Sequence, residues 1–269
     1  GPRARGFFTT RGLRARPVSA PGGGAQDRDA ESEEGTSYDG WNLALHVGDD
    51  PQRVHCHRRR LEKLLGLEQG RHLAWMNQIH SAVVATAQAG EVPTADALVL
   101  DSRTESVPTA DALVLDTRMP GAPAGCCVLV ADCVPVLLAS RDGALTAAVH
   151  AGRRGMLDGV VPATVDSLRR GGVDPADLWA AVGPSICGSC YEVPEEMLAL
   201  SAQREPACAS RTSWGTPGLD VAAGVLAQLE RAGVGHISAG QWCTYEDPRF
   251  FSYRRDGVTG RLAGIGVPQ

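Results

Sequence analysis

The longest apolar stretch of the chain covers residues 126–139 and is broken only by Asp132 and Pro135. It is shorter than the ~18 apolar residues that a membrane-spanning helix needs. A second apolar run follows it, and Arg141-Asp142-Gly143 between the two runs is a turn signal. We therefore expect residues 126–149 to form a buried pair of strands at the centre of the fold.

Helix signals lie on both sides of these strands. Asp49-Asp50-Pro51 combines capping carboxylates with a proline in the first turn, so a helix should begin there and end at Gly66. Residues 155–170 and 219–232 are expected to form two further helices, each followed by a glycine. Strands are also expected over residues 73–86, as a pair that meets near His80, and over 261–267. The fold class is therefore α+β, with mixed sheets covered by helices.

The composition limits the class of protein. The chain has 269 residues, 43% of them hydrophobic and 21% charged, which is enough for one large domain with a sizeable core. A net charge of −5 argues against nucleic acid as the main partner, because phosphate backbones bind to concentrated positive surfaces. No secretory or membrane-spanning segment is visible, so we expect a cytoplasmic protein whose eight cysteines stay reduced.

Three dispersed residues carry the strongest chemical signal. His80, Cys133 and His150 each lie at the edge of an apolar run. Two imidazoles and one thiolate suit zinc or copper, and three protein ligands leave a fourth position open, as in catalytic zinc sites. Cys133 also follows Asp132, a carboxylate in an apolar strand, where an unpaired charge is costly. These three residues are the candidate metal ligands and the candidate catalytic residues.

The segments around these residues resemble the signatures of a known family. In chain order the matching segments are WNLALHVGDD (41–50), WMNQIHS (75–81), VADCVP (130–135), AVHAGRRG (148–155), GPSICGSCYEV (183–193), CTY (243–245) and FFSYRRD (250–256). By this ordered series the chain is identified as a member of the YfiH/YlmD-like laccase-domain family, from about Gly6 to its C-terminus. The series is far more specific than any one of its motifs.

The resemblance implies a single layered α/β/β/α domain over residues 1–269. It also implies a zinc-dependent purine nucleoside phosphorylase that deaminates adenosine, with zinc, or copper as the alternative metal, held by His80, Cys133 and His150. In deamination a metal-activated water would attack C6 of adenosine. In phosphorolysis, phosphate held by arginines would attack C1′ of adenosine, inosine or methylthioadenosine. The partners would be nucleoside and phosphate, with no nucleic acid and no membrane; the preferred nucleoside and the oligomeric state stay open.

Two arginines are candidates for binding phosphate. Arg153 and Arg154 follow a strand and precede a helix, where backbone N–H groups favour an anion. A tight turn with solvated arginines is the competing interpretation. Relatives usually carry Trp at the position of Arg153, so this change could weaken base stacking or strengthen phosphate binding.

The resemblance adds three further residues near the pocket. Within its segment Asn42 is favoured over His46, and Arg11 and Arg254 match arginines of the family. A surface position for Arg11 and a structural salt bridge for Arg254 are the alternatives.

Two other functions are compatible with the sequence. In a Cys–His hydrolase or amidase, acting on a peptidoglycan precursor, Cys133 would be the nucleophile and His150 its base, without a metal. The chain could also be a non-enzymatic copper- or zinc-binding protein. Loss of activity on chelation would favour the metal enzyme over the hydrolase.

Two motifs are not expected to bind metal. His55-Cys56-His57 lies on a predicted helix, where residues i and i+2 do not face each other. Cys187 and Cys190 form a CxxC pair, but the sequence offers no second ligand pair at a suitable spacing. Laccase chemistry is also disfavoured, because multicopper sites use many paired histidines and the chain has seven histidines and one HxH pair.

Two segments look like insertions. Residues 13–37 are polar, rich in Gly, Pro and Ser, and are expected to form a long flexible loop. The segment VPTADALVLD occurs at residues 92–101 and again at 107–116. We expect the second copy to form the strand, because Met119-Pro120-Gly121 continues it as in relatives. The first copy has the same alternation, so the sequence does not decide between them.

Overall fold

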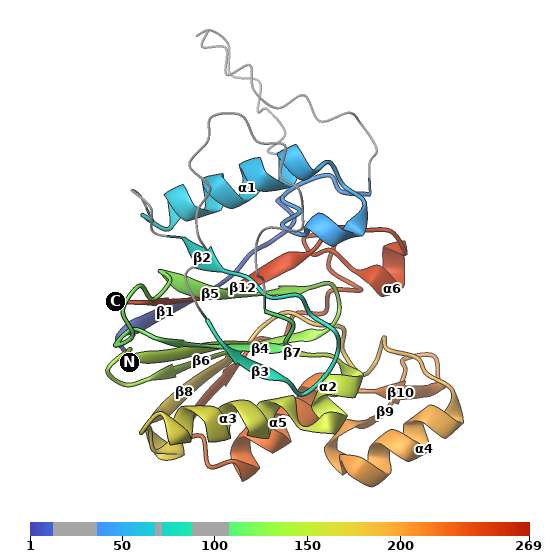
Figure 1. Cartoon of the computed structure of the whole chain (residues 1–269). Helices are drawn as coiled ribbons and strands as arrows, with labels where there is room; N and C mark the ends of the chain where they lie inside the picture. Colours follow the sequence, from blue (N-terminus) through green and yellow to red (C-terminus); the bar gives the residue numbers. More distant parts are fainter. Residues whose placement is uncertain (13–36, 68–71, 88–107) are drawn as a thin grey trace, which may run out of the picture.

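The computed structural model describes residues 1–12, 37–67, 72–87 and 108–269. The elements stack in four layers, with helix α1 over one sheet, two sheets face to face, and helices α3 and α5 under the other sheet (Figure 1). The sheets are mixed and the layer order is α/β/β/α, as expected from the sequence. Within the ranges described, no helix is both long and apolar enough to cross a membrane.

The larger sheet contains six strands in the order β11-β8-β6-β7-β4-β3. Their bounds are β3 Val84–Thr86, β4 Ala112–Asp116, β6 Val134–Ser140, β7 Leu145–Ala151, β8 Leu178–Val182 and β11 His236–Ala239. Strands β6 and β7 form an antiparallel hairpin around the expected turn at residues 141–143, with Pro135 opposite His150. This register brings the start of β6, just after Cys133, to the end of β7 that carries His150.

The smaller sheet contains four strands in the order β1-β12-β5-β2. Their bounds are β1 Ala4–Phe8, β2 Leu73–Ala74, β5 Gly125–Val130 and β12 Leu262–Pro268. Strand β1 pairs antiparallel with β12, so the two ends of the chain lie side by side. Two short strands, β9 Ala209–Arg211 and β10 Pro217–Leu219, pair separately.

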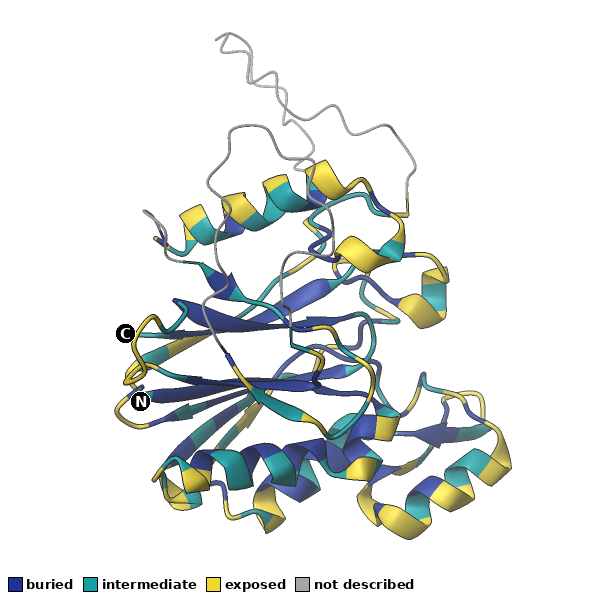
Figure 2. Ribbon diagram, in the orientation of Figure 1, coloured by how far each residue is buried: buried dark blue, intermediate teal, exposed yellow. Residues whose placement is uncertain are grey.

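Alternation along the central strands explains the layering. Leu113 and Leu115 of β4 pack between the two sheets, whereas Ala112 and Val114 face the helices. Both faces of β4 are therefore buried (Figure 2), and a strand of this kind is apolar throughout rather than alternating with polar residues. The face of the smaller sheet that points away from this core packs on α1 through Leu61.

The helices begin where capping residues are available. Asp50 accepts a hydrogen bond from the Gln52 backbone at the start of α1, and Asp220 accepts one from the Ala223 backbone at the start of α5. Both starts were expected from the sequence. The helices are α1 Pro51–Leu64, α2 Arg153–Asp158, α3 Val160–Arg170, α4 Glu195–Arg204, α5 Val221–Arg231 and α6 Tyr253–Asp256, with single 3₁₀ turns at Leu45–Val47, Pro175–Asp177 and Pro206–Cys208.

Three expectations about element boundaries were wrong. The strand pair expected over 73–86 is two short strands, β2 and β3, which lie in different sheets and do not meet at His80. The expected strand pair over 126–149 is three strands, because Asp132 adopts a positive φ of 88° and separates β5 from β6 into different sheets. The expected helix over 155–170 is two helices, α2 and α3, because Gly159 adopts a left-handed conformation with φ 89° between them. Helix α2 also begins two residues earlier than expected, directly after Gly152.

The second copy of the repeat supplies β4, as expected. The first copy, residues 92–101, lies outside the described residues, as does nearly all of the expected insertion at 13–37.

Candidate metal centre and pocket

A buried carboxylate, Asp111, organises the region where His80 and His150 meet. Its side chain accepts hydrogen bonds from the His80 backbone at 2.9 Å and from the Ser81 backbone at 2.6 Å and hydroxyl at 2.7 Å. It also binds Nδ1 of His150 at 2.8 Å. Burial alone would raise the pKa of Asp111, but the bonds from His150 and Ser81 outweigh it and hold that pKa well below its usual range.

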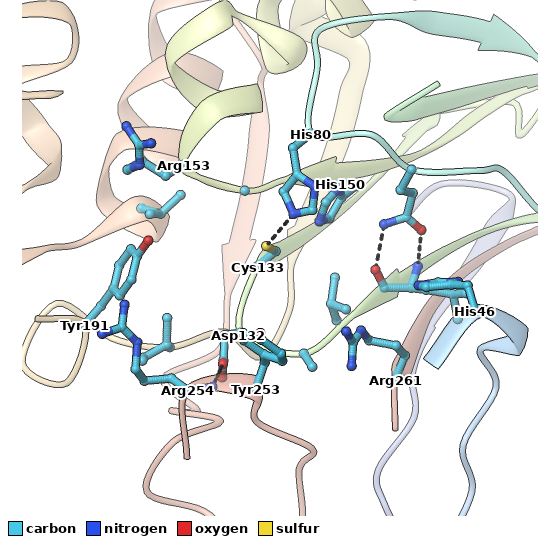
Figure 3. Close-up of a pocket in the computed structure, with 17 residues that line it drawn as sticks. His46, His80, Asp132, Cys133, His150, Arg153, Tyr191, Tyr253, Arg254 and Arg261 are labelled. Atoms are coloured by element: carbon cyan, nitrogen blue, oxygen red, sulfur yellow. Dashed lines mark hydrogen bonds between the residues drawn. The ribbon is translucent and has the colours of Figure 1, made fainter. Parts of the chain in front are cut away.

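The three expected ligands come together at the carboxyl end of β7. The Cys133 sulfur lies 3.8 Å from Nε2 of His80 (Figure 3), and the imidazoles of His80 and His150 meet edge to face with centroids 4.6 Å apart. One ligand atom from each residue can be chosen so that all three lie within 4.8 Å of one another. We name this set the His–Cys–His centre.

The acceptor on Asp111 fixes the tautomer of His150. An ionised carboxylate only accepts, so Nδ1 of His150 carries a proton and Nε2 is the nitrogen left for a ligand. A histidine whose second ring nitrogen is held by a carboxylate is the usual arrangement at metal sites.

Cys133 and His150 shift each other's protonation in the protein without metal. Burial raises the pKa of the Cys133 thiol, but the adjacent His150 and His80 outweigh burial and lower it to about 6. Burial lowers the pKa of His150, but the Cys133 thiolate and Asp111 outweigh it and raise that pKa to about 9. Each of the two groups therefore favours the charged form of the other.

The backbone of Gly152 closely approaches the centre. A Cβ atom added at Gly152 would lie 2.9 Å from the His80 ring and 3.0 Å from the Cys133 sulfur, so a side chain here would crowd these two residues. The two imidazoles and the thiolate of the centre are a donor set that zinc and copper accept. The residues present therefore fit a bound transition-metal ion.

The centre opens into a cavity of about 680 Å³, within the size range of small-molecule sites. Strand ends and loops from both sheets form its walls, with the labelled side chains pointing into it (Figure 3). Besides the centre, its polar lining residues are His46, Gln78, Asp132, Arg153, Tyr191, Tyr253, Arg254 and Arg261.

The other expected site residues divide between the cavity and the scaffold. Arg153 and Arg254 line the cavity, whereas Arg154 is exposed and lies outside it. Asn42 and Arg11 also lie outside it, so His46, not Asn42, is the pocket residue of its segment. Asn42, Arg11 and Arg154 are not among the residues that line this cavity, and their roles in binding substrate or phosphate stay predictions.

The side-chain amide of Asn42 does not face the cavity, because both its nitrogen and its oxygen form hydrogen bonds within the scaffold. Its Nδ2 donates to the Ala44 carbonyl and to Asp49, and its Oδ1 accepts from the Ala44 and Arg261 backbones. Arg11 donates from Nε to the Asp39 carbonyl. Asn42 is therefore a scaffold residue that holds Arg261 in place.

Asp132 also belongs to the scaffold of the pocket. Its carboxylate accepts a hydrogen bond from the Thr244 hydroxyl and another from the Arg254 backbone, each at 2.6 Å. The backbone carbonyl of Asp132 accepts from the Ile186 backbone at 3.0 Å. The carboxylate that looked costly in an apolar strand is thus satisfied, and it ties three distant segments to the residue before Cys133.

Sequence reasoning missed several pocket residues. Arg261, Tyr191 and Tyr253 line the cavity, and Asp111 supports the centre from behind. Both tyrosines lie in the family segments quoted above, and Arg261 lies five residues after the last of these segments, so only their roles were unassigned. Asp111 lies in the second copy of the repeat. The two copies have the same sequence, so the sequence did not show which of their aspartates is buried.

The two rejected motifs have different outcomes. His57 lies on α1, where its Nδ1 bonds to the Asn42 carbonyl, in agreement with a scaffold role. The prediction that no second ligand pair accompanies Cys187 and Cys190 was wrong, because the fold brings Cys243 and Glu246 next to them.

Comparison with known proteins agrees with this fold. Residues 27–267 match the family described as multi-copper polyphenol oxidoreductase laccase. The chain belongs to this laccase-like family, which includes the YfiH and YlmD proteins.

Named relatives and solved structures cover most of the chain. It is 48% identical to a purine nucleoside phosphorylase of Streptomyces coelicolor, over 84% of this chain and 87% of that protein. It is 44% identical to one of Streptomyces griseus, over 84% and 86%. YlmD from Geobacillus stearothermophilus superposes with a TM-score of 0.78 at 28% identity, covering 99% of this chain and 92% of YlmD. The Neisseria meningitidis protein NMB0706 gives 0.74 at 32% identity, over 99% and 95%.

Proposed function

We propose that this protein is a metal-dependent purine nucleoside phosphorylase that also deaminates adenosine. One observation carries the proposal: a single cavity brings the His–Cys–His centre together with three arginine and two tyrosine side chains. The relatives named purine nucleoside phosphorylase support the same reaction.

Three arginines are available for phosphate. Arg261 is anchored because its Nη1 donates to the carbonyl oxygens of Thr259 and Gly260. Arg254 lies over the Tyr191 ring at 4.9 Å, and Arg153 lies on the same side of the view, away from Arg261 (Figure 3). Guanidinium groups bind phosphate oxygens in pairs, so these residues can orient phosphate for attack.

The aromatic residues suit the nucleoside. Tyr191 and Tyr253 offer flat apolar faces and a hydroxyl, which can stack on a purine and bind a ribose hydroxyl. In phosphorolysis a phosphate oxygen forms a bond to C1′ while the bond from C1′ to N9 breaks. The electron pair leaves with the purine, which then takes up a proton.

His80, Cys133 and His150 would hold the metal. When bound, zinc supplies Lewis-acid chemistry that polarises an oxygen or nitrogen of a substrate. Asp111 keeps His150 in the tautomer that presents Nε2 to the centre. In the proposed deamination, water replaces the amino group at C6 and ammonia leaves. Tyr191 and Tyr253 would again orient the purine.

Chromatography of nucleoside products tests the proposal. Zinc-loaded protein should convert inosine to hypoxanthine only with phosphate, and adenosine to inosine with or without it. Folded Cys133→Ala protein should do neither. Unchanged turnover by that variant would refute the assignment of the centre.

A Cys–His hydrolase is the second candidate, because Cys133, His150 and Asp111 form a nucleophile, base and orienting carboxylate. In that mechanism the Cys133 thiolate attacks an amide carbonyl and His150 protonates the leaving amine. Hydrolysis of an amide substrate that survives chelation would favour this candidate over the phosphorylase.

A further inference from the structure

A second group of metal-binding side chains lies outside the His–Cys–His centre. Cys187, Cys190, Cys243 and Glu246 offer three sulfurs and a carboxylate oxygen that all lie within 4.8 Å of one another. All four cysteines at the two sites are free thiols. We name this second set the thiol cluster.

Two tight turns build the thiol cluster. In the first, the Cys190 backbone donates to the Cys187 carbonyl at 3.0 Å; in the second, the Asp247 backbone donates to the Cys243 carbonyl at 3.0 Å. A bridge between Ser185 and Cys243 holds the turns side by side, with the Thr244 backbone donating to the Ser185 carbonyl at 3.0 Å. The fold thus supplies the second ligand pair, Cys243-x-x-Glu246, that spacing alone does not reveal.

The donors already point at one another. The Cys190 thiol donates to Glu246 at 3.2 Å, and the Cys187 backbone N–H donates to the Cys243 sulfur at 3.5 Å. Cys190 and Cys243 are buried with Ile186, whereas Glu246 is exposed. The contact from the Cys187 backbone holds the Cys243 sulfur against the CxxC turn.

Two of the thiols sit in surroundings that disfavour an isolated negative charge. Burial and the neighbouring Glu246 carboxylate raise the pKa of Cys190 well above the ordinary range, and burial together with Cys243 raises the pKa of Cys187. A divalent cation that binds a thiol displaces its proton to solvent.

We propose that Cys187, Cys190, Cys243 and Glu246 form a structural zinc site beside the substrate pocket. Three sulfur donors select zinc over magnesium or calcium, and four protein ligands close the coordination sphere, as in structural sites. The proposal is independent of the reaction at the His–Cys–His centre.

The site has a physical task in the pocket wall. Ile186 and Tyr191, on either side of the CxxC turn, line the cavity, and the Thr244 hydroxyl binds Asp132 beside Cys133. A metal bound by the thiol cluster fastens the 186–191 segment to the 243–246 segment. It would hold the pocket wall without touching substrate.

Metal content measured by mass spectrometry tests the proposal. Protein grown with zinc and then desalted should carry two equivalents. Cys133→Ala should retain one, Cys187→Ser with Cys190→Ser should retain one, and the triple variant should retain none. Cys56→Ser, which removes an exposed cysteine of α1 outside both sites, is the matched control and should keep two.

A cobalt spectrum identifies the ligands. Cobalt-loaded Cys133→Ala protein should show sulfur-to-metal charge-transfer absorption that disappears in the triple variant. Glu246→Gln changes only an exposed side chain, so it keeps the fold; it should weaken zinc retention at this site at least about tenfold in competition with a chelator.

Three results would overturn the proposal. They are a Cys133→Ala protein that binds no zinc, a Glu246→Gln variant of Cys133→Ala with unchanged zinc affinity, and a disulfide among Cys187, Cys190 and Cys243 in protein isolated without reductant. None of them bears on whether the His–Cys–His centre carries out phosphorolysis, which the nucleoside assay measures separately.

Discussion

Asp111 hydrogen-bonds the backbone of His80 and the imidazole of His150, so one buried carboxylate positions two of the three proposed ligands. An asparagine at this position has the same shape but presents an N–H₂ group to donors on one side. The substitution would disturb the orientation of His80 and His150 without removing a ligand atom. Asp111 is therefore a positioning residue.

We expect Asp111→Asn to weaken zinc binding at the His–Cys–His centre about 10–100-fold. It should also lower the free energy of unfolding by about 1–3 kcal/mol, because a buried donor is left opposite another donor. Chelator competition and denaturant unfolding measure the two effects. Asp116→Asn, at the end of strand β4 that follows Asp111, weakens contacts with the exposed Arg118 alone and should change neither by much. Equal effects in both variants would refute the role of Asp111.

The neighbouring arginines Arg153 and Arg154 separate a pocket role from a general charge effect. Arg153→Gln and Arg261→Gln each remove a guanidinium from the cavity wall, whereas Arg154→Gln removes one from the exposed face of α2. The first two should raise the KM for phosphate at least about tenfold, because each removes one charged hydrogen-bonding partner of phosphate. Arg154→Gln should leave this KM nearly unchanged. An equal rise in the KM for phosphate in all three variants would mean that phosphate does not bind in this cavity.

At the scale of elements, the start of α2 determines the space available to a metal. Gly152 precedes the first helical residue and has an ordinary φ of −73°, so alanine there is not strained by the backbone. The added Cβ instead meets His80 and Cys133.

Gly152→Ala should therefore reduce zinc binding at the His–Cys–His centre while the protein stays folded. Metal content and circular dichroism of the purified variant provide the measurement. Gly266→Ala is the control, because its Cβ would meet only ordinary contacts, the nearest 3.5 Å away at Cys126. Full zinc occupancy in Gly152→Ala would show that the ion does not lie against this turn.

The elements that the sequence predicted are those with local signals. Asp50 and Asp220 cap α1 and α5, and both helices begin there because the side chain replaces a missing backbone acceptor. The break at Gly159 was missed, since a glycine within an amphipathic pattern is compatible with a continuous helix until its φ is known. The division of 126–149 into three strands depends on Asp132, whose partners Thr244 and Arg254 lie far away in sequence.

The same reasoning applies to the site. His80, Cys133 and His150 were predicted because their segments carry family signatures, and the fold brings them together. For Asn42, sequence indicates that the residue is near a pocket, but it does not reveal that its amide binds Asp49 and the Arg261 backbone. The thiol cluster was missed because its second pair is joined by tertiary contacts alone.

At the scale of the whole molecule, metal binding should be linked to folding. The ligands of the His–Cys–His centre come from β7, from the loop before β3 and from the loop between the two sheets, and unfolding separates all three. Zinc at 100 times its dissociation constant should then add about 2.7 kcal/mol per site. For a domain of this size that corresponds to a rise of about 5–10 °C in Tm.

Thermal unfolding with zinc and with chelator measures this linkage. His80→Ala should lose the share of the shift that belongs to the His–Cys–His centre. An identical zinc-induced shift in His80→Ala would mean that this centre adds nothing to stability.

The most direct test of the proposed function is a zinc titration of metal-free protein in phosphate buffer, with hypoxanthine release from inosine recorded at each addition. We predict no hypoxanthine release without metal and a rise in release that follows the filling of the His–Cys–His centre. Cys133→Ala should release no hypoxanthine at any zinc concentration. Full release from metal-free protein, or release by Cys133→Ala equal to that of the unmodified protein, would contradict this prediction.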